Sequence, residues 1–477
     1  MVTLVQHLID GAWRGQEDRA RRNPANQTEV VNTSPSADAG TVHDAISAAE
    51  QAASGWASTP APARGAILLD AAELLRTKHS EIARDLVREE GKTLAEATGE
   101  VRRAIDVLRY FGARGWHQDG SVFPSASADT TVLTRQEPLG VVGLITPWNF
   151  PIAIPAWKLA PALIAGNAVV LKPAEFTPAS ADHLARALLA AGLPDGVLNV
   201  VHGAGEVAGK TLVEDDRVAA VSFTGSTDVG MRIQRTVTER RGRVQLEMGG
   251  KNAYLVLDDA APEAAARVVA AGAFGLTGQA CTATSRVYCT PGVRAEFSAA
   301  LATEAKRYQP GDGLATGTAM GPVISEQQLA TDVGAVRTAI DNGATVVTGG
   351  ADPDGLRFEP TVLTDMAQDA DVVRQEVFGP VLAVLPVADL DEGLARVNDS
   401  PYGLAAGICT RDLAAAHHFA AATHVGVVKV NRPTTGLDLN VPFGGVKDSS
   451  TNTFREQGPT ATEFYSWSKT VYFGHDR

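Results

Sequence analysis

Residues 140–172 read GVVGLITPWNFPIAIPAWKLAPALIAGNAVVLK, and their strand–helix–strand pattern predicts the class of fold. Val141 to Ile145 and Ala168 to Leu171 are apolar runs of strand length. Between them, Trp157 to Ala165 has helical spacing and stops at Gly166-Asn167, a typical signal for the end of a helix. Short apolar strands joined by helices predict βαβ units, and therefore a parallel sheet that is covered on both faces.

The same alternation continues along the chain and predicts an α/β protein. It gives further strands at 197–201, 218–223 and 243–246, with helices at 181–191, 206–213 and 229–237 between them. A second alternating series runs from Asn252 to about Asn431. Before the first series, the first hundred residues have helical spacing, and the polar stretch 121–138 suits an exposed strand or hairpin.

Length, charge and cysteine content narrow the class of protein. A chain of 477 residues predicts about three structural units. The net charge of −13 argues against nucleic acid or an anionic membrane as the main partner. No signal-peptide pattern or apolar run of membrane-spanning length is present, and the three cysteines form neither a disulfide framework nor a zinc motif. We therefore expect a cytoplasmic protein with reduced thiols and no metal.

Two cysteines lie in the stretch FGLTGQACTATSRVYC, residues 274–289. Cys289 shares one face of a predicted strand with Val287, so it is expected to be a small buried hydrophobe. Cys281 lies in a polar loop with glycines, where a cysteine can act as a reactive thiolate. A loop cysteine taken alone is more often inert than catalytic, so the sequence pattern leaves both roles open.

Two polar side chains are expected at the carboxyl edge of the first sheet, where open α/β sheets bind ligands. Pro147, Pro151 and Pro155 exclude a regular helix at their position, so the strand ending at Ile145 opens into a loop. Asn149 in this loop offers an amide suited to an oxyanion, although an ordinary Asx turn has the same pattern. Glu247 lies at the end of a later strand, in QLEMGGKN (residues 245–252). Its carboxylate could be a general base or belong to an ordinary loop residue.

A phosphate site is expected where the strand of VSFTGSTDVGMRI (residues 221–233) leads into a helix. Gly225 and Ser226 stand at the start of that helix, where free N–H groups and the helix dipole favour an anion. A plain capped helix explains the same residues. Lys172 and Glu175 follow another strand and could meet a phosphate or a ribose, or be ordinary surface residues.

Seven motifs occur in a fixed order and turn these separate readings into one. They are PWNFP, LKPAE, FTGSTDVG, EMGGKN, GQACTATSR, EVFGP and PFGG. In this order, and over essentially the whole chain, the sequence resembles the aldehyde dehydrogenase superfamily. The resemblance implies a Rossmann-type cofactor domain (1–119 and 139–249), an α/β catalytic domain (250–447) and a small β oligomerisation hairpin (120–138 and 463–477). It also implies a homo-oligomer, either a dimer or a tetramer.

The resemblance assigns roles to the residues found above. Cys281 attacks the aldehyde, the Asn149 side chain and the Cys281 N–H hold the oxyanion, hydride passes to the nicotinamide, and Glu247 activates water to hydrolyse the thioester. The implied cofactor-binding residues are Ile145, Trp148, Lys172, Glu175, Gly225, Ser226, Gly249, Glu376 and Phe378. A carboxylate at position 175 would repel a 2′-phosphate, which favours NAD, while the nearby Lys172 keeps NADP as the alternative.

The substrate is suggested by the C-terminal segments NRPTTGLDLN, DSS and TFREQG (residues 431–440, 448–450 and 453–458), which are similar to α-ketoglutaric semialdehyde (2,5-dioxovalerate) dehydrogenases. That substrate carries a carboxylate, for which Arg103 is the first candidate partner and Arg102 the second. The other implied tunnel residues are uncharged: Phe150, Ala153, Ile154, Trp157, Gly275 and Thr435 to Leu437. Aliphatic or aromatic aldehydes, or another semialdehyde such as succinic semialdehyde, therefore remain alternatives. A non-catalytic member of the fold and a thiol esterase are the competing classes.

Overall fold

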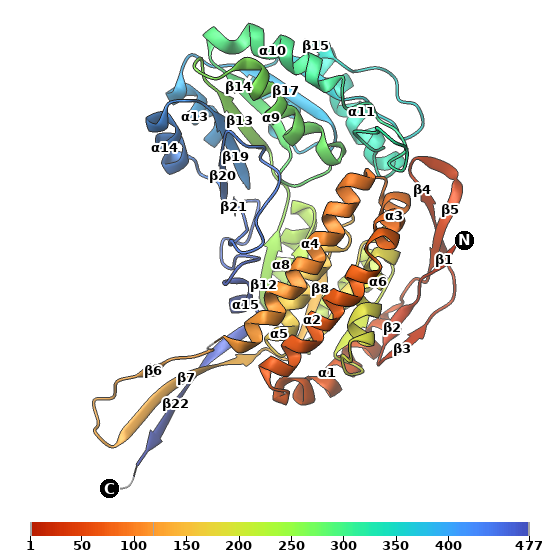
Figure 1. The fold of residues 1–477 in the computed structure, drawn as a ribbon, viewed down its shortest axis with the longest axis vertical. Coiled ribbons are helices and arrows are strands. Elements are labelled where there is room, and N and C mark those ends of the chain that lie inside the picture. Colours follow the sequence, from red (N-terminus) through yellow and green to blue (C-terminus); the bar gives the residue numbers. More distant parts are fainter. Residues whose placement is uncertain (1, 118, 476–477) are drawn as a thin grey trace.

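The computed structural model describes residues 2–117 and 119–475, which form two lobes and a projecting arm (Figure 1). The first lobe is built on a seven-stranded sheet with the order β12-β11-β8-β9-β10-β2-β3. Its strands are β8 (Val141–Ile145), β9 (Ala168–Lys172), β10 (Leu198–Val200), β11 (Val218–Thr224) and β12 (Arg243–Glu247), with β2 (His7–Ile9) and β3 (Ala12–Arg14). The strands β8 to β12 are parallel, and β2 and β3 extend them in antiparallel fashion.

The order of these strands creates a switch point in the first sheet. The chain runs from β8 through β9 to β10 on one side, and then returns to place β11 and β12 on the other side of β8. The connections that leave the neighbouring strands β8 and β11 therefore run in opposite directions, to β9 and to β12. In open α/β sheets, ligands bind outside the carboxyl ends of the strands at such a point.

Helices cover both faces of this sheet because successive strand residues point to opposite sides. Val142 and Leu144 pack with one group of helices, whereas Val141 and Ile145 pack with the other. The first group comprises α2 (Ala61–Thr77), α3 (His79–Glu90), α4 (Leu94–Ala113), α5 (Ala153–Ile164) and α6 (Pro178–Ala190). The second comprises α1 (Ala39–Ser58), α7 (Lys210–Glu214) and α8 (Thr227–Glu239). The α/β expectation for this lobe is therefore confirmed.

Helix α5 begins earlier than the prolines suggested. It starts at Ala153 and contains both Pro155 and Pro161. Pro155 lies in the first turn, where its missing N–H has no helical partner to lose. The prolines therefore shape the loop up to residue 152 without delaying the helix to Trp157.

The prediction of helices throughout the first hundred residues was wrong for the first third of that segment. A three-stranded sheet with the order β1-β5-β4 forms there from β1 (Thr3–Leu4), β4 (Arg19–Asn23) and β5 (Asn26–Ser34). β4 and the first residues of β5 are largely exposed, and these strands carry arginine and asparagine in place of alternating apolar residues. The period of two that announces a half-buried strand was therefore absent from the sequence.

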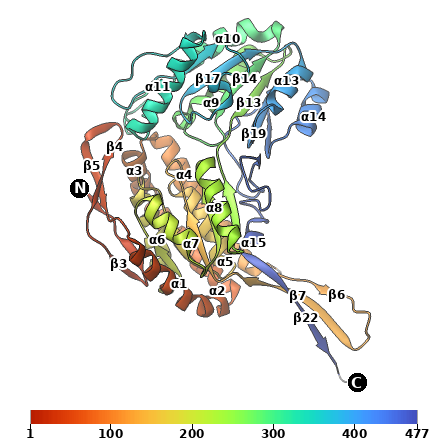
Figure 2. The same cartoon turned by 180° about the vertical axis from the view of Figure 1, so that it is seen from behind.

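The second lobe repeats the same architecture around another seven-stranded sheet, with the order β15-β16-β17-β14-β13-β19-β20. Its strands are β13 (Asn252–Val256), β14 (Thr284–Cys289), β15 (Thr345–Thr348), β16 (Thr361–Thr364), β17 (Val381–Pro386), β19 (Ala405–Cys409) and β20 (Val427–Val430). The flanking helices are α9 (Pro262–Phe274), α10 (Pro291–Ala305), α11 (Glu326–Asp341), α12 (Asp371–Arg374), α13 (Leu390–Asn398) and α14 (Leu413–Ala422). Figure 2 shows this lobe from behind.

The projecting arm is a three-stranded antiparallel sheet that extends from the first lobe (Figures 1 and 2). Strand β22 (Ser466–Gly474) pairs along the full length of β7 (Thr130–Pro138), and β6 (Val122–Phe123) flanks β7. Several large apolar side chains on the arm are exposed, namely Val122, Phe123, Trp467, Tyr472 and Phe473. No helix in the described part of the chain is long and apolar enough to cross a membrane.

Candidate active site

Asn149 and Cys281 meet where the two lobes face each other. Asn149 lies in the loop between β8 and α5, and its side chain is buried. Its Nδ2 donates a hydrogen bond to the backbone carbonyl of Gln279 over 2.9 Å. Because Gln279 precedes Cys281 by two residues, the amide of Asn149 is directed at the loop of residues 275–283 that carries Cys281, here called the cysteine loop.

The cysteine loop is strained and held at several points. After α9 the chain passes through Leu276 and Thr277, which both adopt positive φ angles, of 55° and 57°. Such conformations persist only where surrounding contacts fix them. Leu276 N–H donates to Glu96 over 2.7 Å, and Asn252 Nδ2 donates to the carbonyl of Cys281 itself over 2.7 Å. The sulfur therefore stands on a backbone that is held in one conformation, and its side chain is partly exposed, whereas Cys289 is buried.

The surroundings of Cys281 favour the thiol over the thiolate. Burial raises the pKa of the Cys281 thiol, and the carboxyl groups of Glu247, Glu376 and Glu456 raise it further. The backbone N–H of Thr282 opposes them only in part. The polar loop seen in the sequence therefore does not generate a thiolate by itself. The thiol must lose its proton before the sulfur can attack as a thiolate.

Glu247 is one of the three carboxyl groups that act on the Cys281 thiol. It ends β12, is buried, and receives a 3.4 Å hydrogen bond from Ser450 Oγ on its Oε1. Its Oε2 has no hydrogen-bond partner among the residues that the structure describes. Burial, reinforced by the neighbouring Glu456, raises the pKa of Glu247 well above its ordinary value, while Lys158 and Arg455 act in the opposite direction.

A buried ion pair next to Glu247 could not be recognised from the sequence. Lys158 on α5 contacts Glu456 Oε1 through its Nζ and also donates to Ser222 Oγ over 2.7 Å. Lys158 and Glu456 are nearly inaccessible to solvent, yet they are 298 residues apart in the chain. The sequence signal for this pair is limited to Glu456 itself, which lies in the segment TFREQG and has no local pattern that points to Lys158.

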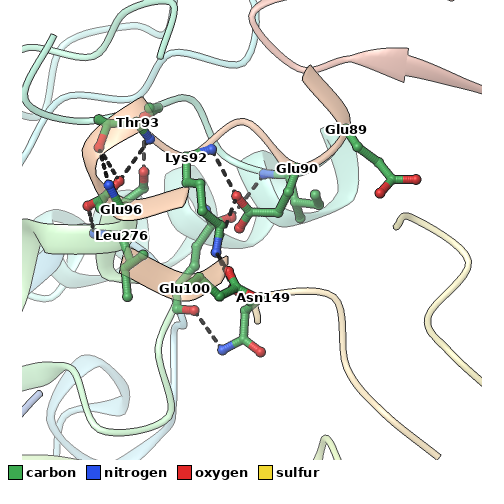
Figure 3. A network of polar contacts seen from close by, with 12 residues as sticks. Glu89, Glu90, Lys92, Thr93, Glu96, Glu100, Asn149 and Leu276 are labelled. Atoms are coloured by element: carbon green, nitrogen blue, oxygen red, sulfur yellow. Dashed lines mark hydrogen bonds and ion pairs between the residues drawn. The ribbon is translucent and has the colours of Figure 1, made fainter. Parts of the chain in front are cut away.

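A second buried ion pair supports the loop that carries Asn149 (Figure 3). Lys92, in the turn between α3 and α4, donates to Glu100 Oε2 over 2.6 Å and to the backbone carbonyl of Asn149 over 2.7 Å. Glu100 uses its other oxygen to accept from the N–H groups of Ile152 and Ala153, at 3.0 and 3.1 Å. The pair therefore holds the loop at Asn149 and at the start of α5.

The carboxyl edge of the first sheet offers polar groups without partners. Thr146 and Thr224 follow β8 and end β11, and their buried hydroxyls have no hydrogen-bond partner in the described chain. Ser226 stands before α8, and its side chain does not cap the helix. At Gly225, an added Cβ would lie 2.5 Å from the Phe223 ring. Free hydroxyls and N–H groups at a helix start fit the pyrophosphate of a dinucleotide.

Lys172 ends β9 beside this edge, and Glu175 follows three residues later. Lys172 is buried, and burial together with the nearby Arg19 lowers its pKa to about 8. Glu175 is half-buried and forms an ion pair with Arg19. Ile145, the last residue of β8, is buried in the core.

The second lobe brings Glu376 and Phe378 to the same edge. Glu376 Oε1 accepts from Gly250 N–H over 2.9 Å, and its carboxyl group covers Gly249, where an added Cβ would lie 2.1 Å from Glu376 Oε2. Burial raises the pKa of Glu376 to about 7, against the opposing effects of Gly250 N–H and Lys251. Phe378 packs edge-to-face on Trp148 with ring centres 5.4 Å apart. Trp148, Gly249, Glu376 and Phe378 are therefore drawn together across the two lobes.

The residues expected to bind the substrate differ in burial and in the groups that they contact. Arg103 on α4 is partly buried and donates to Gln457 Oε1 over 2.5 Å, next to Glu456. Burial lowers the pKa of Arg103, and Asp438 and Asp106 oppose this. Arg102 is exposed. Among the uncharged residues, the Phe150 ring lies 4.9 Å from the Lys92 ammonium, and Trp157 packs against Phe443. Leu437 precedes Asp438 and is half-buried. Ala153 and Ile154 are almost fully buried.

The comparison with known families agrees with this geometry. The family model "Aldehyde dehydrogenase family" matches residues 13–471. The chain belongs to the aldehyde dehydrogenase family. Membership confirms the expected superfamily and the expected activity, an NAD(P)-dependent oxidation of aldehydes.

Curated relatives and solved structures refine this membership. The chain is 46% identical to the α-ketoglutarate semialdehyde dehydrogenase of Haloferax volcanii, over 99% of both chains. It is 44% identical to the 2,5-dioxopentanoate dehydrogenase of Saccharolobus solfataricus, over 98% of this chain and 99% of the relative. These matches confirm the expected likeness to that group.

Two solved structures show the same fold with different cofactors. An NADP-dependent enzyme of E. coli superposes with a TM-score of 0.95 at 35% identity, covering 98% of each chain. The betaine aldehyde dehydrogenase of Staphylococcus aureus, solved with NAD+, superposes with a TM-score of 0.95 at 32% identity, covering 99% of this chain and 95% of that one. Both nicotinamide cofactors therefore occur among close structural neighbours.

Proposed function

We propose that this protein oxidises α-ketoglutaric semialdehyde to 2-oxoglutarate with NAD(P)+. The observation that carries the proposal is the likeness, at 46% and 44% identity over nearly complete chains, to two relatives named for this substrate. The substrate is an aldehyde that also carries a carboxylate, so the site needs a cation in addition to the reacting groups.

Arg103 supplies that cation in the proposal. Its guanidinium lies beside Gln457, one residue from the buried Glu456 that adjoins Glu247. The carboxylate of Asp438 attracts the Arg103 guanidinium, so a substrate carboxylate would compete with Asp438 for that guanidinium. Bidentate recognition of a carboxylate is the task for which arginine is best suited.

The first chemical step is addition of Cys281 to the aldehyde. The Cys281 thiol gives up its proton to solvent water, the new C–S bond forms, and the carbonyl electron pair moves to oxygen. Asn149 Nδ2 carries two hydrogens and uses one for Gln279, so the second is available for the oxyanion. The Cys281 N–H is the other proposed donor. Such donors stabilise the charge that develops in the transition state.

The second step releases the acid. Bound NAD(P)+ supplies the acceptor for the hydride that leaves the tetrahedral carbon, and the acyl group remains on Cys281 as a thioester. Glu247 then removes a proton from water as the water oxygen attacks the acyl carbon, and the same proton passes from Glu247 to the sulfur as the thiol leaves. The raised pKa of Glu247 makes it a stronger base than an ordinary carboxylate once it is ionised.

The organisation of the molecule follows the same proposal. Residues 1–119 and 139–249 would bind the cofactor and residues 250–447 would carry the nucleophile. Residues 120–138 and 463–477 would join subunits of a homodimer or homotetramer. The exposed apolar side chains of the arm support this last role, since an apolar surface of that kind marks an interaction site. We place the enzyme in the cytoplasm.

A panel of aldehydes tests the substrate. We expect α-ketoglutaric semialdehyde to give the highest kcat/KM, above succinic semialdehyde and above uncharged aliphatic and aromatic aldehydes. Replacing Arg103 by methionine should raise KM for the two semialdehydes and leave that for hexanal unchanged. Arg102→Met is the matched control, because it removes an exposed charge from the same helix. A preference for hexanal in the native enzyme would refute the proposed substrate.

A further inference from the structure

Arg19, which no part of the proposed mechanism uses, lies at the adenosine end of the proposed cofactor site. It is the first residue of β4 in the small N-terminal sheet. Its guanidinium Nη1 donates to Glu175 Oε1, 156 residues further along the chain. Both side chains remain accessible, with exposed fractions of 45% for Arg19 and 27% for Glu175.

A second basic group lies near this pair. Burial, together with repulsion from the nearby Arg19, lowers the pKa of Lys172 to about 8. Arg19 therefore lies near Lys172 as well as contacting Glu175. The neighbouring Arg21 is committed elsewhere, because its guanidinium donates to the carbonyls of Glu89 and Ile324.

The position of the pair in the fold identifies its ligand class. Glu175 follows β9, which is the strand after β8 and adjacent to it. In dinucleotide-binding sheets an acidic residue in this region binds the ribose 2′-hydroxyl of NAD, and an arginine nearby accommodates the 2′-phosphate of NADP. Here both residues are present and paired with each other.

We propose that Arg19, with Lys172, forms a subsite for the 2′-phosphate of NADP+, and that Arg19 is a cofactor-specificity residue of this enzyme. The inference rests on the proposed placement of the cofactor at this edge of the sheet. An unpaired Glu175 would repel a phosphate, which was the reason to expect NAD. Arg19 neutralises that carboxylate and can transfer its hydrogen bonds to the phosphate. Because Arg19 donates its hydrogen bond to Glu175 Oε1, the other oxygen of Glu175, Oε2, stays available to a ribose hydroxyl when NAD+ is bound.

Nucleotide binding tests the subsite without turnover. Titration calorimetry with NADP+ and NAD+ would be performed on the native chain and on Arg19→Ala. Arg19→Ala would remove a charge-assisted hydrogen bond to the phosphate, and the partial exposure of Arg19 weakens that bond. We therefore expect the ratio of NADP+ to NAD+ affinity to fall about tenfold in Arg19→Ala. Steady-state kcat/KM for the two cofactors should shift in the same ratio.

Two further variants make the test specific. Arg22→Ala removes an exposed arginine from the same strand, one that donates to the carbonyl of Gln27 and does not touch Glu175, so it should leave the ratio unchanged. Glu175→Gln should raise the ratio, because it removes the repulsive charge. The adenosine end can be isolated with 2′,5′-ADP and 5′-AMP, and Arg19→Ala should weaken only the former.

The inference fails if Arg19→Ala weakens both cofactors equally, or if the native enzyme binds no NADP+ at concentrations where NAD+ saturates it. Either outcome would leave the ranking of aldehydes unaffected. Conversely, a preference for uncharged aldehydes would overturn the proposed substrate and leave the NADP+ to NAD+ ratio as the measure of Arg19. The two proposals can therefore fail separately.

Discussion

Replacing Lys92 by methionine should slow the chemical step by releasing the loop of Asn149. Methionine keeps most of the side-chain volume but removes the 2.7 Å hydrogen bond to the Asn149 carbonyl and the 2.6 Å contact with Glu100. A charged hydrogen bond is worth about 1.5–3 kcal/mol, which corresponds to roughly 10- to 150-fold in rate if it is lost in the transition state. The ceiling is the full contribution of an oxyanion donor, about 10²–10³-fold.

The assay is the single-turnover rate of NADH formation, measured in a double-mutant cycle. Lys92→Met and Asn149→Ala would be made singly and together. If Lys92 acts by positioning Asn149, the double variant should be no slower than Asn149→Ala alone, because coupled residues give non-additive effects. Costs that multiply in the double variant would refute the reasoning.

Stability provides the control for this cycle. Breaking a buried ion pair costs about 3–5 kcal/mol, so Lys92→Met should also lower Tm. Glu89→Gln perturbs another buried carboxyl group, which holds Asn32 and the start of α6 and does not touch Asn149. That variant should lower Tm with no loss of single-turnover rate, which separates destabilisation from positioning.

Three other predictions concern titratable groups. Cys281→Ala should abolish NADH formation, while Cys289→Ala should retain it and lower only Tm, as checked by turnover and thermal melts. Glu247→Gln should give a burst of NADH followed by slow turnover. The deacylation rate of the native enzyme should rise with pH through the raised pKa of Glu247, whereas the deacylation rate of the variant should not change with pH. Asp332 is buried, with its pKa raised to about 8 from an ordinary 3.8, so its contribution to stability is present below pH 3.8 and lost as pH rises through 8. Asp332→Asn should therefore gain Tm over the native enzyme progressively between pH 4 and pH 8.

The elements with strong local patterns were predictable from the sequence. The apolar runs that became β8 and β9 and the helical spacing of α5 are written in consecutive residues. The strands before residue 35 were missed because they are short, or largely exposed like β4, and do not alternate. Local pattern therefore identified the parallel strands of the first sheet and missed both its two N-terminal strands and the small N-terminal sheet.

The partners of the site residues were not predictable in the same way. Lys92 meets Asn149 across 57 residues, Arg19 meets Glu175 across 156, and Lys158 meets Glu456 across 298. Each is a single charged residue with no periodic signal around it. The family motifs named the groups that would react, whereas only the folded chain shows which buried charges hold those groups and shift their pKa values.

The route of the chain after residue 447 limits how this enzyme can be recombined with its relatives. That segment leaves the second lobe and returns to the first, where Glu456 meets Lys158 and the carbonyl of Tyr465 accepts from Asn167. A chimera that exchanged everything after residue 250 would place a foreign partner against Lys158. Crossover points near 250 and 447 would keep each ion pair within one parent, so gene shuffling for new substrates should exchange the middle segment alone.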